Sequence, residues 1–242
     1  MLIFGKNAIL EALRSEKTFN SLLVDKTSHD KQLQEIIDLA RKNNLRISFV
    51  DRKIIDTKAS KIKTDAKILH QGVIGEIVDF EYCEIEDILQ ADTTPFIIIL
   101  DGVEDPHNLG AIIRTAECAG ATGIIIPEHR ACAINETVIK TSAGAISNVK
   151  IARVTNINNA IDKLKENGVW VYACEVGGEN LFKSNLKGSV AIVLGSEGNG
   201  TSKLTLKKCD GIVTIPMFGK INSLNVSVAA AIAMFEVVRQ SK

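Results

Sequence analysis

FIIILDGVEDPHNLGAIIRTAECAGATGIII, residues Phe96–Ile126, is the stretch that decides the fold. It opens with the continuous apolar run Phe96–Leu100, which is typical of a parallel strand buried on both faces. A helical pattern follows over Leu109–Ala119 and stops at Gly120, after which Gly123–Ile126 is a second apolar strand. A strand, a helix and a strand joined by short connections predict a βαβ unit.

The same alternation continues toward the C-terminus. We expect strands over Val149–Val154, Val169–Cys174, Val190–Leu194 and Gly211–Ile215, and helices after the N-cap Asn135, over Ile157–Glu166 and over Ser202–Lys208. Alternating short strands and helices predict an α/β fold with a mostly parallel sheet covered on both faces. Ligands of such sheets bind beyond the carboxyl ends of the strands.

Residues 1–79 alternate in a similar way and predict a smaller α/β domain. Its helical patterns are Ala8–Leu13 and Leu33–Ala40, and its strands are Ser21–Val24, Arg46–Val50 and Val73–Val78. Residues 80–92 hold five acidic residues and no basic residue, which indicates a linker. We therefore expect the second domain to span residues 93–242.

Charge and composition narrow the class of protein. The chain carries 29 basic and 29 acidic residues, so net charge gives no support for nucleic-acid binding, and the basic stretch Lys58–Lys63 alone favours a solvated surface over phosphate contacts. The five cysteines are scattered and the four histidines lack ligand spacing, which indicates a reducing compartment and no metal site. The N-terminal residues lack the apolar stretch of a signal peptide, and the sequence has no run of about 20 apolar residues. We therefore expect a cytoplasmic protein that does not enter a membrane.

The last predicted helix, Leu224–Arg239, is apolar on nearly every face. Such a helix is normally buried on all sides. Burial against a second subunit and burial in the core of a monomer both account for this pattern, and the sequence does not separate them.

Three segments at predicted strand ends carry polar residues suited to chemistry. Asn108 and Arg114 follow the first strand and are expected to reach the same side of a cleft, with Asn108 just ahead of the helix. Glu197 lies in a glycine-rich loop after Leu194. Ser223 suits the N-cap of the last helix, whose first turn offers free backbone N–H groups. Taken singly, these are also what a surface arginine, a tight turn and a helix cap look like.

The glycine-rich loop also invites comparison with a nucleotide-binding P-loop. Gly195 and Gly200 have the P-loop spacing, but Thr201 stands where that motif needs a lysine to reach the phosphates. A dinucleotide-binding Gly-x-Gly-x-x-Gly fingerprint is also missing at the start of the second domain. Both nucleotide-binding interpretations therefore fail on their chemistry.

Together the three segments resemble the three motifs of the SpoU (TrmH) branch of the SPOUT RNA methyltransferases. They read NLGAIIRTA from Asn108, GSEGNG from Gly195, and IPM from Ile215 followed by SLNVSV from Ser223. The opening FGKNAILEAL from Phe4 and the sequence DPHN before the first motif are similar to RlmB-like members, which methylate a guanosine of 23S ribosomal RNA. The resemblance covers the whole chain.

The resemblance implies a fold and a partner for each domain. Residues 1–79 would form an L30e-like domain that binds RNA, and residues 93–242 a SPOUT domain with a deep trefoil knot, a rare exception to unknotted chains. The last helix would help to form the knot and a homodimer interface. The substrate would be 23S ribosomal RNA or a ribosomal assembly intermediate, with transfer RNA as the alternative and a non-catalytic RNA-binding or assembly factor as the second alternative.

The resemblance also implies the site and its cofactor. S-adenosylmethionine would rest on the backbone of Gly195, Ile215 and Leu224, without a metal. The target ribose would be surrounded by Asn108, Arg114, Glu197, Ser223 and Asn225. An arginine side chain does not give up its proton in proteins, so we expect Arg114 to hold the RNA phosphate and the ribose oxygen rather than to act as the base. Glu197 would orient Arg114 or Asn108.

Overall fold

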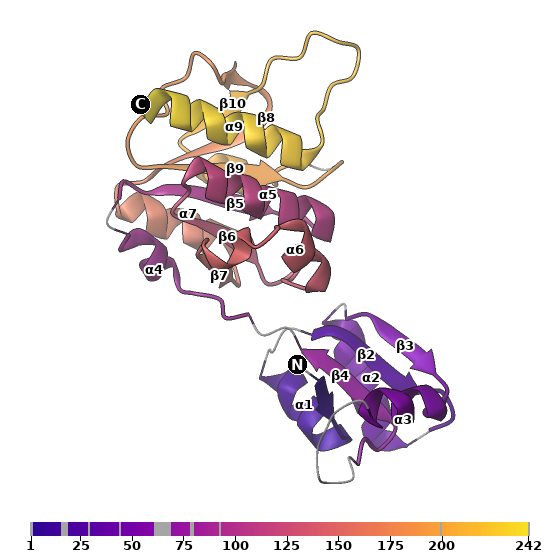
Figure 1. Cartoon of the computed structure of the whole chain (residues 1–242). Helices are drawn as coiled ribbons and strands as arrows, with labels where there is room; N and C mark the ends of the chain where they lie inside the picture. The colour runs from indigo at the N-terminus through magenta and orange to yellow at the C-terminus, as the bar shows by residue number, and fades with distance from the viewer. Residues whose placement is uncertain are drawn as a thin grey trace. The chain divides into compact units, whose positions relative to one another are not determined.

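A computed structural model of the chain describes residues 2–15, 19–28, 30–43, 45–60, 69–77, 80–91, 93–198 and 200–241 (Figure 1). Two of the basic residues singled out above, Lys61 and Lys63, and the end of the predicted strand at Val78 lie outside these ranges. The chain divides into two compact units. The first comprises residues 1–80 with 134–136, and the second comprises residues 81–133 and 137–242.

The first unit is built on a four-stranded sheet in the order β1-β4-β2-β3. Its strands are β1 (Leu2–Phe4), β2 (Phe19–Asp25), β3 (Ile47–Val50) and β4 (Val73–Ile77). Its helices are α1 (Lys6–Arg14), α2 (Lys31–Lys42) and α3 (Arg52–Ser60). β4 is antiparallel to β1 and β2, whereas β3 is parallel to β2. The five predicted elements of this region are present.

Helices cover both faces of this small sheet. On one face α1 and α2 bury residues such as Ile9 and Ile36 against Leu22. On the other face α3 packs Ile55 and Ala59 against Ile74. The sequence did not predict α3, because only Ile55 and Ala59 of its nine residues are buried and the apolar pattern is short. It also did not predict β1, which has three residues.

The second unit contains a six-stranded, all-parallel sheet in the order β10-β8-β9-β5-β6-β7. Its strands are β5 (Phe96–Asp101), β6 (Gly123–Pro127), β7 (Ile151–Val154), β8 (Trp170–Asn180), β9 (Val190–Gly195) and β10 (Gly211–Thr214). The apolar run that begins at Phe96 is a central strand between β9 and β6, with Ile97–Leu100 fully buried. The predicted α/β fold with a parallel sheet is confirmed.

Helices cover both faces of the parallel sheet (Figure 1). α5 (Pro106–Ala119) and α9 (Val226–Ser241) lie side by side on one face. On the other face α7 (Ile157–Glu166) packs against β5 and β6 and contacts α8 (Lys203–Lys208). The remaining elements are α6 (Glu136–Thr141), directly after the predicted N-cap Asn135, and a 3-10 turn over Ala145–Ser147.

The segment predicted as an acidic linker contains a short helix, α4 (Ile85–Leu89). Ile85 and Ile88 are buried in the core of the second unit, and the backbone N–H of Cys83 donates to the carbonyl of Ile151 on β7 (2.9 Å). The residues from Cys83 onward therefore belong to the packed sheet unit. The prediction of a linker considered only the acidic residues of this segment. Ile85 and Ile88 are three residues apart, so both side chains lie on one side of the helix turn.

α9 has one buried side and one exposed apolar side. Ala230, Ala233 and Met234 are fully buried, whereas Val228 and Phe235 are 45% and 50% exposed. Of the two alternatives left open by the sequence, burial in the core of a monomer is therefore wrong, and burial against a second subunit stays a prediction. Among the described residues, no helix is long and apolar enough to cross a membrane.

A buried carboxylate fixes the C-terminal end of α9. Glu236 is 4% exposed and accepts hydrogen bonds from Arg239 (2.7 and 2.8 Å) and from Gln240 (2.7 Å). Gln240 in turn accepts from the backbone N–H of Leu186 (2.9 Å) and donates to the carbonyl of Ser184 (3.0 Å). The hydrogen bond from Arg239 is the main reason that the pKa of Glu236 lies below its ordinary value of 4.5.

We predict that Glu236→Ala lowers the free energy of unfolding at neutral pH by about 1.5–3 kcal/mol, as expected for hydrogen bonds to a charged group. Folding lowers the pKa of Glu236 from its ordinary value of 4.5. The ionised carboxylate therefore stabilises the folded protein above pH 4.5, and this contribution is lost as the pH falls through the folded pKa. The difference from wild type should therefore shrink in acid.

Urea titrations at neutral and at acidic pH, followed by the fluorescence of Trp170, measure the unfolding of the second unit, because Trp170 is the single tryptophan of the chain. Glu166→Ala, at an exposed position in α7, is the control and should match wild type. A loss that is the same at neutral and acidic pH would contradict this role.

Candidate active site

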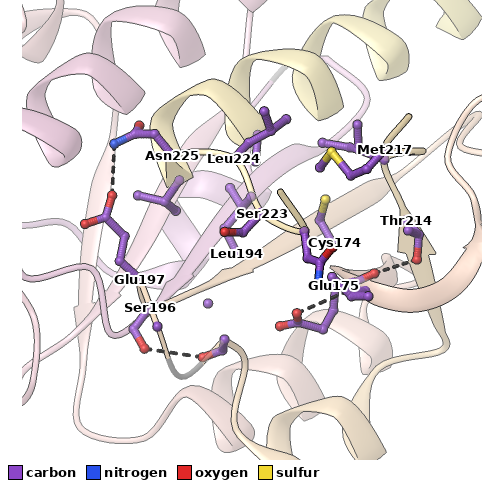
Figure 2. A pocket seen from close by; sticks show the side chains of 18 residues that line it. Cys174, Glu175, Leu194, Ser196, Glu197, Thr214, Met217, Ser223, Leu224 and Asn225 are labelled. Carbon is purple, nitrogen blue, oxygen red and sulfur yellow. Dashed lines mark hydrogen bonds between the residues drawn. The ribbon is translucent and has the colours of Figure 1, made fainter. Parts of the chain in front are cut away.

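A cavity of about 450 Å³ lies at the carboxyl ends of β9 and β10 and beside the middle of β8 (Figure 2). Its wall comes from three stretches of chain, residues 174–176, the loop after β9, and the segment between β10 and the first turns of α9. Its volume is in the range of small-molecule sites, which is about 300–1,000 Å³. All three residues predicted to hold a cofactor, Gly195, Ile215 and Leu224, line it.

The loop after β9 turns back sharply on itself. Ser196 and Gly200 exchange two backbone hydrogen bonds, N–H of Ser196 to the carbonyl of Gly200 (3.1 Å) and the reverse (3.0 Å). A side chain at Gly195 would overlap the backbone where Gly200 meets Thr201. Gly198 and Gly200 have φ values of 93° and 65°, which non-glycine residues rarely adopt. The glycine spacing is therefore required by a turn whose backbone faces the cavity.

A polar cluster borders the cavity on the side of α5. The side-chain amide of Asn108 donates to Glu197 Oε1 (2.8 Å), and the amide of Asn225 donates both to Glu197 Oε1 (2.9 Å) and to Asn108 Oδ1 (3.0 Å). The structure thus brings together three predicted residues from three distant segments. Glu197 Oε2 and the second amide hydrogen of Asn108 keep hydrogen-bonding capacity for a substrate.

The starts of two helices position this cluster. α5 begins at Pro106 with Asp105 as its N-cap, whose carboxylate accepts from the N–H of His107 (2.7 Å), so Asn108 lies in the first turn and not ahead of the helix. α9 begins at Val226, and Asn225 Oδ1 accepts from the N–H of Ser227 (2.9 Å). Asn225 therefore caps α9.

The predicted cap, Ser223, lies upstream of α9 in an exposed stretch that lines the cavity. The correction has a local cause: the chain between Met217 and Asn225 remains outside the helix, and the first side-chain oxygen that meets the free N–H groups belongs to Asn225.

Arg114 is exposed on α5 and is not among the described residues that line the cavity. The expectation that Arg114 and Asn108 reach the same side of a cleft stays a prediction, because neither side chain is among the described residues of the cavity wall. Six residues of α-helix advance about 9 Å and turn about 240°, so the two side chains leave the helix on different sides. The structure leaves Arg114 apart from the cluster of Asn108, Glu197 and Asn225.

Sequence reasoning missed the part of the wall that lies within β8, because the predicted strand ended at Cys174 whereas β8 continues to Asn180. Glu175 lines the cavity, and its carboxylate accepts from the backbone N–H of Thr201 (2.8 Å) and of Val176 (3.1 Å). Thr214 also lines the cavity, and its hydroxyl donates to the carbonyl of Glu175 (2.6 Å). The sequence does contain a feature that points to Glu175. This residue directly follows the predicted strand Val169–Cys174, and ligands of parallel sheets bind beyond the carboxyl ends of the strands.

Cys174 is the one thiol among the described residues of the wall. Burial and, second, the nearby carboxylate of Glu175 raise the pKa of Cys174 to about 11. The thiol is therefore protonated at neutral pH and is a poor nucleophile toward an electrophile in the cavity. Within the described part of the chain, no group of three or more histidine, cysteine or acidic side chains is arranged to hold a metal ion.

Comparison with known protein families follows the division into two units. The model of the "SpoU rRNA Methylase family" matches residues 95–235, and the model for "RNA 2'-O ribose methyltransferase substrate binding" matches residues 2–83. A TrmH family tRNA/rRNA methyltransferase of Bacillus subtilis (strain 168), YacO, is 40% identical over 244 residues, which cover 98% of this chain and 95% of that protein. A relative of the same family from Staphylococcus aureus (strain MSSA476) is 41% identical over 247 residues, covering 99% and 96%.

Solved structures share the architecture. The SpoU methyltransferase AviRb from Streptomyces viridochromogenes, in complex with AdoMet, has a TM-score of 0.63 at 22% identity over 99% of this chain and 90% of its own. The A. aeolicus TrmH/SpoU tRNA modifying enzyme has a TM-score of 0.57 at 28% identity over 64% of this chain and 80% of its own. The family match spans more than half of the chain and includes the loop and helix segments that build the cavity. This chain belongs to the SpoU (TrmH) family of RNA methyltransferases.

Proposed function

We propose that this protein transfers a methyl group from S-adenosylmethionine to a ribose 2′-hydroxyl, most specifically that of a guanosine in 23S ribosomal RNA. The observation that carries this proposal is the joining of Asn108, Glu197 and Asn225 at the rim of the cavity. Amide and carboxylate groups of this kind suit a ribose hydroxyl, because they both donate and accept hydrogen bonds.

The residues of the cavity fit S-adenosylmethionine. Gly195 lets the loop close tightly beside the cavity, Ile215 and Leu224 offer apolar contacts, and the acidic side chains of the wall suit the positive charge of a sulfonium. In the bound state the cofactor would supply an electrophilic methyl group. We assign its binding to Gly195, Ile215 and Leu224.

The other side chains hold the acceptor and manage its proton. Asn108, Glu197, Ser223 and Asn225 would surround the ribose, with Glu197 orienting Asn108 through their 2.8 Å hydrogen bond. Arg114, which is exposed, is suited to an RNA phosphate and to the negative charge that develops on the ribose oxygen. The hydroxyl proton would pass to that phosphate or to water, because a guanidinium stays charged.

The substrate assignment rests on both units. The first unit matches a substrate-binding family, and its opening segment from Phe4 resembles that of RlmB-like proteins, which supports ribosomal RNA. Transfer RNA is the second candidate, because several relatives are named for both kinds of RNA. A non-catalytic assembly factor would tolerate loss of the polar cluster, but every member of it is present.

We also propose that the protein works as a homodimer through α9. Val228 and Phe235 form an exposed apolar side of this helix, and Phe218 and Ile221 are exposed in the loop that precedes it. Apolar patches of this kind mark interfaces in soluble proteins. The trefoil knot of the SPOUT domain stays a prediction.

We predict that labelled S-adenosylmethionine transfers its methyl group to a single guanosine of large-subunit RNA, as mapped by nuclease digestion of separated ribosomal and transfer RNA pools. Arg114→Ala should lower kcat/KM about 100-fold or more, as for removal of a charge-stabilising donor. Its affinity for the cofactor should be unchanged, because Arg114 is not part of the described cavity wall.

Arg114→Lys, which keeps the charge, should also lose most of the activity, and near-normal turnover would exclude a role for the planar, multi-donor group. Label confined to transfer RNA would overturn the choice of substrate but not the reaction. Cofactor binding without label in either pool would favour the RNA-binding alternative.

We predict that Gly195→Ala abolishes binding of S-adenosylmethionine in calorimetry, because its methyl group would overlap the backbone at Gly200 and Thr201 and force the loop open. Gly219→Ala is the matched control, since a side chain at Gly219 meets no atom within 4 Å. Equal affinities in the two variants would show that the cofactor does not rest on this loop.

We predict that Phe235→Asp converts a wild-type dimer into a monomer in sedimentation velocity. Leu204→Asp is the control, because Leu204 is 57% exposed on α8 and not on α9, so this variant should stay dimeric. A monomeric wild-type protein, or a dimeric Phe235→Asp variant, would contradict the proposed interface.

A further inference from the structure

The charged side chains among the described residues of the cavity wall are all acidic. Glu175 and Glu197 both line the cavity, and no lysine, arginine or histidine is among the described residues of the wall. In Figure 2 the two carboxylates come from opposite sides of the cavity, Glu197 beside Asn225 and Glu175 beside Thr214. Cys174 adds no charge at neutral pH, because its thiol is protonated.

The two carboxylates have different tasks. Glu197 is engaged with Asn108 and Asn225 in the polar cluster assigned to the ribose. Glu175 has no contact in that cluster. Its Oε2 accepts from the N–H of Thr201 (2.8 Å) and its Oε1 from the N–H of Val176 (3.1 Å), and each oxygen keeps a second lone pair. Glu175 is thus a half-buried negative charge fixed by backbone against the glycine-rich loop.

Methyl transfer changes the charge of the ligand that the proposed function places in this cavity. The bond between the methyl carbon and the sulfonium sulfur breaks, and a bond from that carbon to the ribose 2′-oxygen forms, while the hydroxyl proton leaves to phosphate or water. The sulfur keeps the electron pair, so a cationic sulfonium becomes a neutral thioether in S-adenosylhomocysteine. A fixed negative charge nearby attracts the first ligand more strongly than the second, and partial exclusion of water strengthens this difference.

We propose that Glu175 is a specificity-determining residue that makes the cavity prefer the cationic methyl donor over its neutral-sulfur product. This inference rests on the proposed S-adenosylmethionine-dependent function and assigns a role to a side chain outside its polar cluster. This preference favours replacement of spent cofactor by fresh cofactor in the cavity.

The substitution that tests this role is Glu175→Gln. Glutamine has nearly the same shape and keeps an oxygen that accepts from Thr201, but it removes the charge. Glu175→Asp keeps the charge on a shorter side chain. Glu179→Gln is the matched control, because Glu179 is an exposed acid on the same strand and is not among the described wall residues.

The experiment is calorimetric titration of each protein with S-adenosylmethionine, with S-adenosylhomocysteine and with sinefungin, whose amine carries a positive charge in place of the sulfonium. The wild type should bind S-adenosylmethionine more tightly than S-adenosylhomocysteine at neutral pH. In Glu175→Gln the ratio of the two affinities should fall about tenfold, which corresponds to about 1.4 kcal/mol. Sinefungin should weaken together with S-adenosylmethionine, whereas Glu175→Asp and Glu179→Gln should keep the wild-type ratio.

Two results would overturn the proposal, and both differ from failure of the proposed function. If Glu175→Gln weakens all three ligands by the same factor, Glu175 only holds the loop. If the wild type prefers S-adenosylhomocysteine, the charge does not select the donor, and this result needs no variant to fold. A wild type that binds none of the three ligands would contradict the proposed function itself, and the inference with it.

Discussion

The rest of the site depends on one close approach of backbone to backbone. At Gly195 the chain leaves β9 and returns so tightly that a single methyl group would overlap the peptide between Gly200 and Thr201. Two hydrogen bonds between Ser196 and Gly200 close this turn, and Glu175 holds it from the neighbouring strand through the N–H of Thr201. Because peptide groups and not side chains form this surface, a flat polar ligand can approach it closely.

The parallel sheet explains why residues far apart in sequence meet at this turn. In a parallel sheet the strands run in the same direction, so the ends of β9 and β10 lie at the same edge, and the middle of β8 passes between them. The starts of α5 and α9 reach the same edge and add Asn108 and Asn225, and Glu197 joins them through one oxygen atom. The geometry of the polar cluster is therefore a consequence of strand order and of where two helices begin.

Acidic and basic side chains are separated around the cavity. Its described wall carries two carboxylates and no basic side chain, whereas Arg114 is exposed outside it. Acidic walls favour a cationic ligand, and an exposed guanidinium favours a phosphate. The separation of these charges suits a reaction in which a cationic donor enters the cavity and a polyanionic acceptor approaches from outside.

The sequence by itself determined the fold class and much of the site. The apolar runs Phe96–Leu100 and Gly123–Ile126, with the helix between them, required a parallel sheet, because short strands without a polar face are stable only when both faces are covered. The assignment of Gly195, Ile215 and Leu224 to a cofactor came from the resemblance to the SpoU motifs, which are short local segments that can be recognised in the sequence.

Only the tertiary structure decided which polar groups touch. It joined Asn108 to Glu197 and Asn225, replaced Ser223 by Asn225 as the cap of α9, placed α4 in the packed core, and added Glu175 to the cavity wall. Sequence patterns record burial and local propensity, which act over a few residues. Hydrogen bonds such as that from Asn108 to Glu197 join residues 89 positions apart, so they depend on strand order and helix rotation, which local patterns do not specify.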